Sequence, residues 1–340
     1  MYKQYLLYFL KGVIKMKKLL LCIVVLVLSI SMVVAFALCN PKAAEAEAKE
    51  DISVYFLVMG MAGDPYHETI VKGARKAADM HGIDLNVFYA EADIKTQVDQ
   101  LESAIVAAPD GICFYLSNPE AFDEPVQRAL DAGIPIVALS LDDPEGAAGN
   151  PRLAYIGPEL LESGRIIARR MLQYFEKGDH VLVTAEYAGM VYATLRYQGI
   201  EEVFSAEGIT TEMLDCTHER SEIISRTSTY MIGNPQTKGI IGVGALVTAD
   251  AGKVVKDLDL KGKVYAGGFD LNEDTLNWIK EGYIEATVDA QPFLIGYLSV
   301  QQFYFNSWAG FNFMSIDTGT GIIDAENVDK VLEFPEPMVR

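Results

Sequence analysis

Short apolar runs and longer stretches with helical spacing alternate along the chain from residue 51 onward. The run 52–59 is largely apolar, and the stretch after it places Ile70, Ala74 and Ala78 on one helical face. Nearly continuous apolar strands between amphipathic helices are typical of a parallel sheet that helices cover on both faces. The first half of the chain is therefore predicted to hold strands at 52–59, 83–89, 111–116, 134–139 and 153–156, with helices between them.

The same rhythm restarts after a loop at 142–151 that is rich in Gly, Pro and Asp. A helix over 160–175 comes first, and a helix over 292–308 followed by the run 314–318 predicts a return to the first half. Two similar runs of strands indicate two Rossmann-like α/β lobes with parallel sheets, in a chain long enough for two domains. The strands predicted for the second lobe are 180–185, 210–214, 239–243, 264–267 and 284–288.

The amino-terminal segment has the charge pattern of an export signal. Lys15, Lys17 and Lys18 lie directly before the apolar run 19–38, and no acidic residue occurs before residue 45. We predict a signal peptide over 1–38 whose translation starts at Met16, because Met16 opens a normal basic region. A retained membrane anchor is the alternative, since the run is about long enough to span a bilayer.

Two cleavage chemistries fit the end of this signal. Ala35-Phe36-Ala37 has the small-x-small form of an ordinary signal peptidase site, whereas Leu38-Cys39 suggests a lipoprotein that carries its lipid on Cys39. The polar segment 39–50 is predicted to be a flexible tether. In both cases the protein works in the periplasm or at the extracellular face of the cytoplasmic membrane, and its predicted membrane contact is the lipid on Cys39.

Charge and cysteine content exclude several classes of partner. The whole chain carries −19, and the part from Cys39 onward has 23 basic and 47 acidic residues, a net charge of −24. Such a body favours neither nucleic acid nor anionic membrane surfaces. Cys113 and Cys216 lie in apolar runs and are predicted to be buried, reduced and unbridged. The four histidines are scattered, so no metal site is predicted.

Polar residues follow two successive strands of the second lobe. Asp270 comes after the strand 264–267, and Asp289 and Gln291 come after 284–288. Ligands of open α/β sheets bind outside the carboxyl ends of the strands, so these side chains are predicted to face one crevice. The alternative is that Asp270 only initiates the turn before the next helix.

Two further segments offer groups that suit a sugar. Asp64, Tyr66 and His67 follow the first strand, where rings can cover the C–H face of a pyranose and a carboxylate can accept from hydroxyls. Arg196 offers a fork of donors that could bridge sugar oxygens and pair with Asp270. The alternatives are a helix cap for Asp64, a packed ring for Tyr66 and a solvated helix charge for Arg196.

The sequence contains no motif that supports an enzymatic function or a cofactor site. Gly242-x-Gly244-Ala245 lacks the third glycine and the distant acidic residue of a dinucleotide site, so a tight strand-to-helix turn is the better interpretation. The sequence shows no phosphate-binding loop, nucleophile elbow or ordered Ser/His/Asp set. We therefore predict a binding protein without a cofactor.

Six segments follow one another along the chain in a distinctive order. They are Asp64-Pro65-Tyr66, Gly133-Ile134-Pro135-Ile136-Val137, Arg196-x-x-Gly199, Gly268-Phe269-Asp270, Ala286-Thr287-Val288 and Gln291-Pro292. In order and spacing they resemble the periplasmic sugar-binding proteins of ABC importers, in particular the ribose-binding type. Regulators of the lac-repressor type share the fold, but this chain has an export signal in place of their helix-turn-helix. The resemblance covers about 52–331 and implies two lobes joined by three crossings, near Gly157, Ala290 and Thr318.

The resemblance also implies lobe boundaries and site residues. It places the N-terminal lobe at 51–157 plus 291–317 and the C-terminal lobe at 158–290 plus 318–340. Tyr66 and His67 match the aromatic pair over the sugar, Arg196 and Asp270 match the sugar-binding arginine and aspartate, and Asn118 lies near a binding asparagine. The ligand-binding set predicted from all these arguments is Asp64, Tyr66, His67, Asn118, Ser140, Asp142, Arg196, Asp270, Asp289 and Gln291.

Three departures from the ribose-binding pattern argue against ribose itself. Ser140-Leu141, followed by Asp142, stands where those proteins have Asp-Arg. Gly244 replaces an asparagine, and Ala290 replaces a glutamine, which leaves Gln291 or Asp289 to serve. The resemblance implies capture of another monosaccharide or a polyol for a membrane permease. The alternatives are a sensory subunit for a chemoreceptor or membrane kinase and, with least support, an enzyme on the same fold.

Overall fold

The computed structural model describes residues 52–333. The predicted signal peptide, the start at Met16, the tether and the lipid site Cys39 lie outside the described residues. Within 52–333, no helix is both long enough and apolar enough to cross a membrane.

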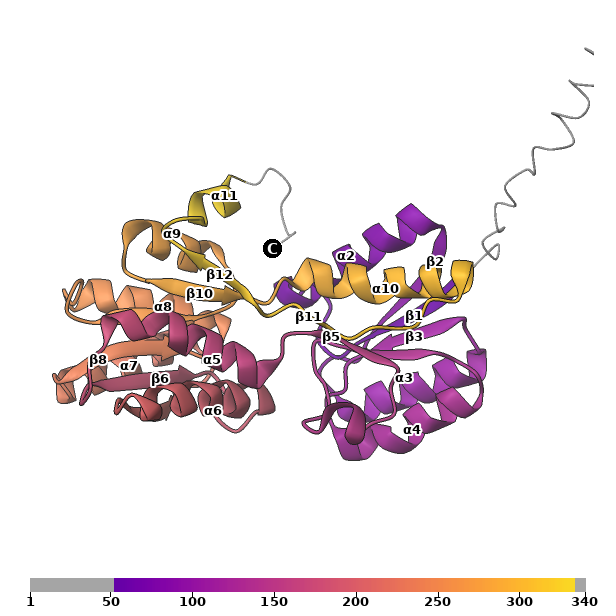
Figure 1. The fold of residues 1–340 in the computed structure, drawn as a ribbon, viewed down its shortest axis with the longest axis horizontal. Helices are drawn as coiled ribbons and strands as arrows, with labels where there is room; N and C mark the ends of the chain where they lie inside the picture. The colour runs from indigo at the N-terminus through magenta and orange to yellow at the C-terminus, as the bar shows by residue number, and fades with distance from the viewer. Residues whose placement is uncertain (1–51, 334–340) are drawn as a thin grey trace, which may run out of the picture. The chain divides into compact units, whose positions relative to one another are not determined.

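The described chain forms two six-stranded sheets with helices on their faces (Figure 1). All strands of the first sheet run parallel, and β11 joins it at the edge, next to β5. The apolar run 314–318 therefore does return to the first sheet, as the sequence predicted. In spatial order this sheet comprises β11 (Ile316–Asp317), β5 (Ala154–Gly157), β4 (Ile136–Leu139), β3 (Gly111–Phe114), β1 (Ile52–Val58) and β2 (Ile83–Tyr89).

The second sheet has the same order of neighbours but ends in an antiparallel edge strand that the sequence did not predict. Gly321, where β12 begins, lies opposite Asp289, the last residue of β10, so β12 runs back along its neighbour. Its sequence, Gly-Ile-Ile-Asp, holds only two apolar residues, so it did not stand out as a strand. In spatial order the sheet comprises β12 (Gly321–Asp324), β10 (Ala286–Asp289), β9 (Tyr265–Phe269), β8 (Thr237–Gly242), β6 (His180–Ala185) and β7 (Thr210–Asp215).

Helices pack on the faces of each sheet. Those of the first sheet are α2 (Pro65–His81), α3 (Ile94–Ala107), α4 (Pro119–Asp131) and α10 (Pro292–Ala309). Those of the second are α5 (Leu160–Met171), α6 (Val191–Ala206), α7 (Arg220–Gly233), α8 (Ala245–Asp257), α9 (Glu273–Glu281) and α11 (Val328–Leu332). The helix predicted over 160–175 ends as a 3-10 turn at Leu172–Tyr174, and a second 3-10 turn, Gly146–Ala148, interrupts the polar loop.

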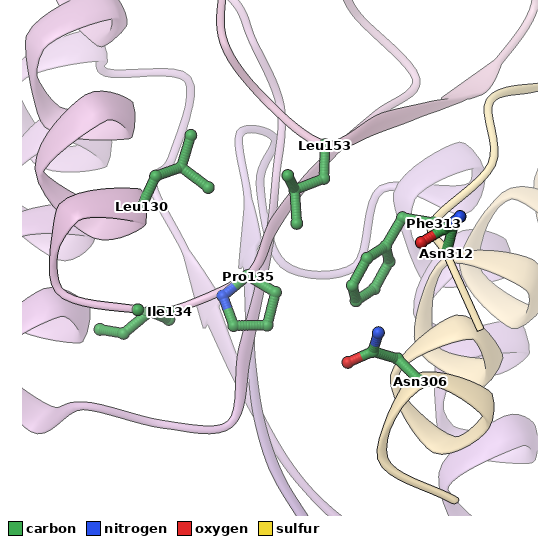
Figure 2. Close-up of a pocket in the computed structure, with 8 residues that line it drawn as sticks. Leu130, Ile134, Pro135, Leu153, Asn306, Asn312 and Phe313 are labelled. Carbon is green, nitrogen blue, oxygen red and sulfur yellow. The ribbon is translucent and has the colours of Figure 1, made fainter. Parts of the chain in front are cut away.

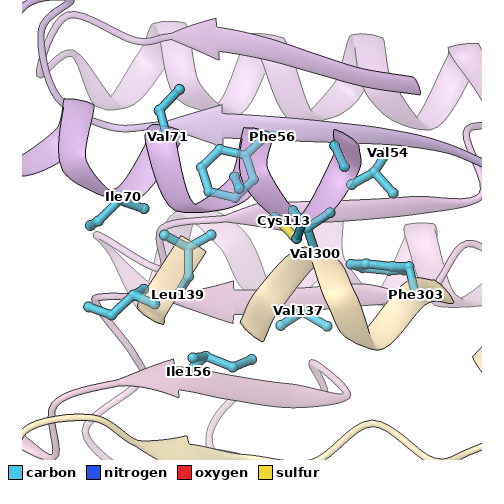
Figure 3. Packing of buried hydrophobic residues seen from close by; sticks show 14 of the residues in the cluster. Val54, Phe56, Ile70, Val71, Cys113, Val137, Leu139, Ile156, Val300 and Phe303 are labelled. Carbon is cyan, nitrogen blue, oxygen red and sulfur yellow. The ribbon is translucent and has the colours of Figure 1, made fainter. Parts of the chain in front are cut away.

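The largest core of the first sheet lies between its strands and the pair α2 and α10 (Figure 3). Phe56, Val137 and Ile156 come from three strands, whereas Ile70 and Val300 come from the two helices, and all five are fully buried. Burial of such side chains contributes about 1.5–3 kcal/mol each, so this layer holds the strand ends of the first sheet in place.

Glycines bring the paired helices of each sheet into backbone contact. A Cβ built on Gly296 of α10 would lie 1.8 Å from the carbonyl oxygen of Ile70 in α2. In the second sheet, a Cβ on Gly199 of α6 would lie 2.2 Å from the carbonyl oxygen of Leu161 in α5. Gly199 belongs to the segment that carried the family resemblance, and its role is this close helix packing, which also positions Arg196 one turn earlier.

Cys113 and Cys216 are free and fully buried, as predicted. Burial raises the pKa of the Cys113 thiol, which suppresses the reactive thiolate. We expect a fragment that begins at residue 51 to react with a thiol reagent at two sites per chain, and only after denaturation. Rapid labelling of the native protein, or a disulfide between the two that a reductant cleaves, would contradict this.

The chain crosses between the sheets three times. It leaves the first sheet after Gly157, returns between Asp289 and Ile316, and leaves again between Asp317 and Gly321. The lobe boundaries given above stay a prediction.

Candidate functional site

Three polar residues at strand ends adopt a left-handed backbone that non-glycine residues rarely use. Ser140 follows β4 with φ 63°, Asp270 follows β9 with φ 63°, and Gln291 lies just beyond β10 with φ 53°. Such conformations cost about 1–3 kcal/mol each and cluster at binding sites. All three belong to the set that the sequence predicted.

On the first sheet, Tyr66 and Ser140 contact each other directly. Their hydroxyl oxygens are 3.0 Å apart. The Tyr155 hydroxyl donates to the backbone oxygen of Ser140, which supports the unusual turn. Burial, reinforced by the negative charge of Asp270, raises the pKa of Tyr66 to about 12, so its hydroxyl keeps its proton at neutral pH.

Asp64 and His67 form a second polar unit at the start of α2. The Asp64 carboxylate accepts from the backbone amides of Tyr66 and His67 and lies 2.9 Å from Nδ1 of His67. The His67 hydrogen bond is the main cause that lowers the pKa of Asp64. Asp64 therefore caps the helix, as the alternative interpretation held, and also orients the His67 ring beside Tyr115, 5.5 Å between centroids.

On the second sheet, Arg196 and Asp270 form the predicted ion pair. Nη1 of Arg196 lies 3.5 Å from the Asp270 carboxylate and donates to the backbone oxygen of Val243 at 2.7 Å. The guanidinium also sits 4.2 Å from the centre of the Phe269 ring. Arg196 is only 5% exposed, and among the described residues its Nε has no hydrogen-bond partner. A solvated helix charge, the alternative interpretation, does not describe this buried side chain.

Asp289 and Gln291 lie where the chain passes back from the second sheet to the first. The Asp289 carboxylate accepts from the Gln291 backbone amide at 2.8 Å, and the Gln291 side-chain amide donates to the backbone oxygen of Thr318 at 2.7 Å. Gln291 thus ties two of the three crossings together. One N–H of this amide is engaged there, which leaves the second N–H and the side-chain oxygen as groups it could offer to a ligand.

Two predicted residues have structural partners of their own. Asn118 caps α4 by accepting from the backbone amide of Ala121. Asp142 forms a two-point ion pair with Arg152, a buried residue that the sequence analysis did not consider. The structure therefore gives both side chains a role in the polar loops of the first sheet.

The sequence analysis missed two strand-end residues, Tyr115 and Glu186. Tyr115 directly follows β3 and is fully buried, and among the described residues its hydroxyl has no hydrogen-bond partner. Glu186 directly follows β6 and is 7% exposed. Their positions after predicted strands were a usable signal, but Tyr115 was counted in an apolar run and Glu186 was overlooked.

A pocket of about 490 Å³ lies at the end of the first sheet that is opposite the carboxyl ends of its strands (Figure 2). It is lined by Pro135 and Leu153, which precede β4 and β5, and by Phe313 beyond α10. These residues stand at the amino ends of the strands. Ligands of open α/β sheets bind at the carboxyl ends, so this pocket is not the expected solute site.

Comparison with known proteins identifies the family. Residues 54–305 match the model of the periplasmic binding protein domain. The chain belongs to this family. The predicted resemblance and the fold class, a type I periplasmic binding protein, are thereby confirmed.

Individual relatives are named for sugars. The xylose/arabinose-binding protein XylF of Sulfolobus acidocaldarius is 31% identical over 254 residues, which are 71% of this chain and 63% of that protein. The chain thus spans less than two thirds of that relative's length. The D-ribose/D-allose-binding protein of Pseudomonas aeruginosa is 22% identical over 68% of this chain and 75% of its own length.

Solved structures agree with this assignment. A solute-binding protein of an ABC transporter from Burkholderia graminis, in complex with D-arabinose, superimposes with a TM-score of 0.73 at 25% identity over 85% of this chain and 99% of its own. A periplasmic sugar-binding protein from Legionella pneumophila gives a TM-score of 0.69 at 27% identity over 78% and 99%. This chain therefore shares its family with the sugar-binding proteins of ABC transporters, and these relatives are named as binding proteins, not as enzymes.

Proposed function

We propose that this protein captures a monosaccharide or a related polyol outside the cytoplasmic membrane and delivers it to the permease of an ABC transporter. The observation that carries the proposal is the buried Arg196–Asp270 pair, whose arginine keeps one N–H without a partner among the described residues. A buried guanidinium with a spare donor beside a carboxylate offers both a donor and an acceptor to a sugar's vicinal hydroxyls.

The first sheet supplies the complementary surface in this proposal. Tyr66 and His67 provide rings for the C–H face of the ligand. Ser140 and the Tyr115 hydroxyl, which has no hydrogen-bond partner within residues 52–333, provide polar contacts. We further propose Asp64, Asp289 and Gln291 as residues that shape this site, and Asn118 and Asp142 as its most peripheral members. The relatives are named for pentoses and for a hexose, which supports a simple sugar as the ligand.

Closure about the three crossings would bury the ligand, as in hinge-closing binding proteins. The export signal and the lipid on Cys39 belong to the same proposal, because a tethered receptor stays near its permease. A receptor of this kind needs neither cofactor nor metal.

A ligand screen tests the proposal. We expect at least one neutral pentose, hexose or polyol to raise the melting temperature of the protein, and calorimetry to give one site per chain. A ligand at about 100 times its dissociation constant should stabilise the folded state by roughly 2.7 kcal/mol. Turnover of the sugar, or the absence of a shift with every sugar and polyol tested, would contradict the proposal.

A further inference from the structure

Glu186 is a buried carboxylate whose contacts were not foreseen from the sequence. It follows the last residue of β6 and so stands at the same edge of the second sheet as Asp270. Its Oε1 accepts from the backbone amides of Leu246 and Val247, at 2.9 and 3.2 Å, in the first turn of α8. The helix N-terminus therefore holds one carboxylate oxygen and favours its negative charge.

Gly244 provides the space that the carboxylate fills. A Cβ built on Gly244 would lie 2.2 Å from Oε2 of Glu186, much closer than two such atoms can approach. The backbone of Gly244 is extended, with φ −145°, a conformation that any residue can adopt. Glycine is therefore needed here to leave space for the Glu186 carboxylate and not for its backbone conformation. A side chain at position 244 would therefore have to displace the Glu186 carboxylate from the place it now occupies.

The second carboxylate oxygen is linked to Arg196 indirectly, because Tyr192 contacts both. The Tyr192 hydroxyl donates to Oε2 at 3.3 Å, and the Arg196 guanidinium lies 5.8 Å from the Tyr192 ring centre. Burial raises the pKa of Glu186 and the charge of Asp270 adds to this, whereas the α8 amides oppose it. Glu186 is therefore electrostatically part of the proposed sugar site.

We propose that Glu186 is a specificity-determining residue of this site, and that its Oε2 accepts a hydrogen bond from a hydroxyl or amine of the ligand. The inference rests on the proposed function. An ionised carboxylate only accepts, so the group opposite Oε2 must donate. Asp270 pairs directly with the Arg196 guanidinium, and Glu186 adds a second carboxylate that contacts Tyr192, the ring beside that guanidinium. The site consequently selects neutral or cationic polyhydroxy ligands and rejects sugar acids and sugar phosphates.

Glu186→Gln tests this contact with little change in volume. The amide can keep its oxygen on the α8 backbone, which turns a donor toward the ligand in place of Oε2. We expect the affinity for the best neutral sugar of the screen to fall about tenfold or more, because a hydrogen bond to a charged group is lost. The ratio between the dissociation constants for glucuronate and glucose should also become smaller in this variant. Glu207→Gln, an exposed residue at the end of α6, removes the same charge and should change neither.

A second pair of variants tests, without any ligand, whether side chains at positions 186 and 244 compete for the same space. Gly244→Asn alone should lower the melting temperature, because its side chain meets the Glu186 carboxylate, whereas Gly244→Asn combined with Glu186→Gly should recover most of the loss. An unchanged affinity and selectivity in Glu186→Gln, with the sugar response still lost in Asp270→Ala, would overturn the inference and leave the proposed function intact. If no sugar or polyol binds the unaltered protein, both fail.

Discussion

Asp270→Ala will remove most of the thermal stabilisation that a bound sugar gives this protein. The substitution leaves the buried Arg196 guanidinium without its carboxylate and the ligand hydroxyls without their acceptor. Leaving such groups unpaired in a shielded site costs about 2–4 kcal/mol of binding. A ligand at about 1,000 times its dissociation constant stabilises the folded protein by roughly 4 kcal/mol. The loss of binding energy in the variant therefore removes most of the ligand-induced rise in melting temperature. Differential scanning fluorimetry with the ligand from the screen measures it directly.

Arg196→Ala should have a similar effect, and the double variant should lose much less than the sum. The two side chains are 3.5 Å apart and share the ligand, so each single change already disables the other. Asp274→Ala is a suitable control, because Asp274 pairs with Arg220 near the start of α9 and not with Arg196. Full retention of the shift in both single variants would place the site elsewhere.

The sequence predicted the sheets from local pattern, and it predicted this ion pair from the strand ends together with the family resemblance. Apolar strands such as β1 and β6 are continuous enough to be recognised, and the carboxyl ends of parallel strands meet at one edge whatever the loops do. Asp270 and Arg196 could thus be brought together before any contact was known. The antiparallel β12 could not be predicted, because its direction depends on the position at which it meets β10.

The remaining site residues depended on contacts across long sequence separations. Asp142 was predicted to bind ligand, but its partner Arg152 lies across a polar loop whose path no pattern fixes. Glu186 was missed because its place depends on the missing side chain of Gly244, 58 positions away. Gly244 was noticed only as part of a tight strand-to-helix turn and as a departure from the ribose-binding pattern. Such complementary pairs become visible only when the packing is known.

The largest effect on stability is expected where the backbones of α2 and α10 are in contact. Gly296→Ala should destabilise the protein by about 3 kcal/mol or more, because the new methyl group meets the Ile70 carbonyl oxygen of a packed helix and not a movable side chain. This exceeds the gain of about 1 kcal/mol that alanine normally brings to a helix interior. For a domain of this size we expect the melting temperature to fall by roughly 6–12 °C.

Gly233→Ala separates this packing effect from helix propensity. Gly233 is the last residue of α7, and a Cβ there meets no atom within 4 Å. We expect this variant to be neutral or up to about 1 kcal/mol more stable, since alanine restricts the unfolded chain and favours the helix. Equal melting temperatures for Gly296→Ala and Gly233→Ala would show that α2 and α10 are not in backbone contact. A large loss of stability in Gly296→Ala alone would show that the two helix backbones are in contact. This contact also supports Tyr66, because Tyr66 lies in the first turn of α2 and α10 packs with α2 in the same core.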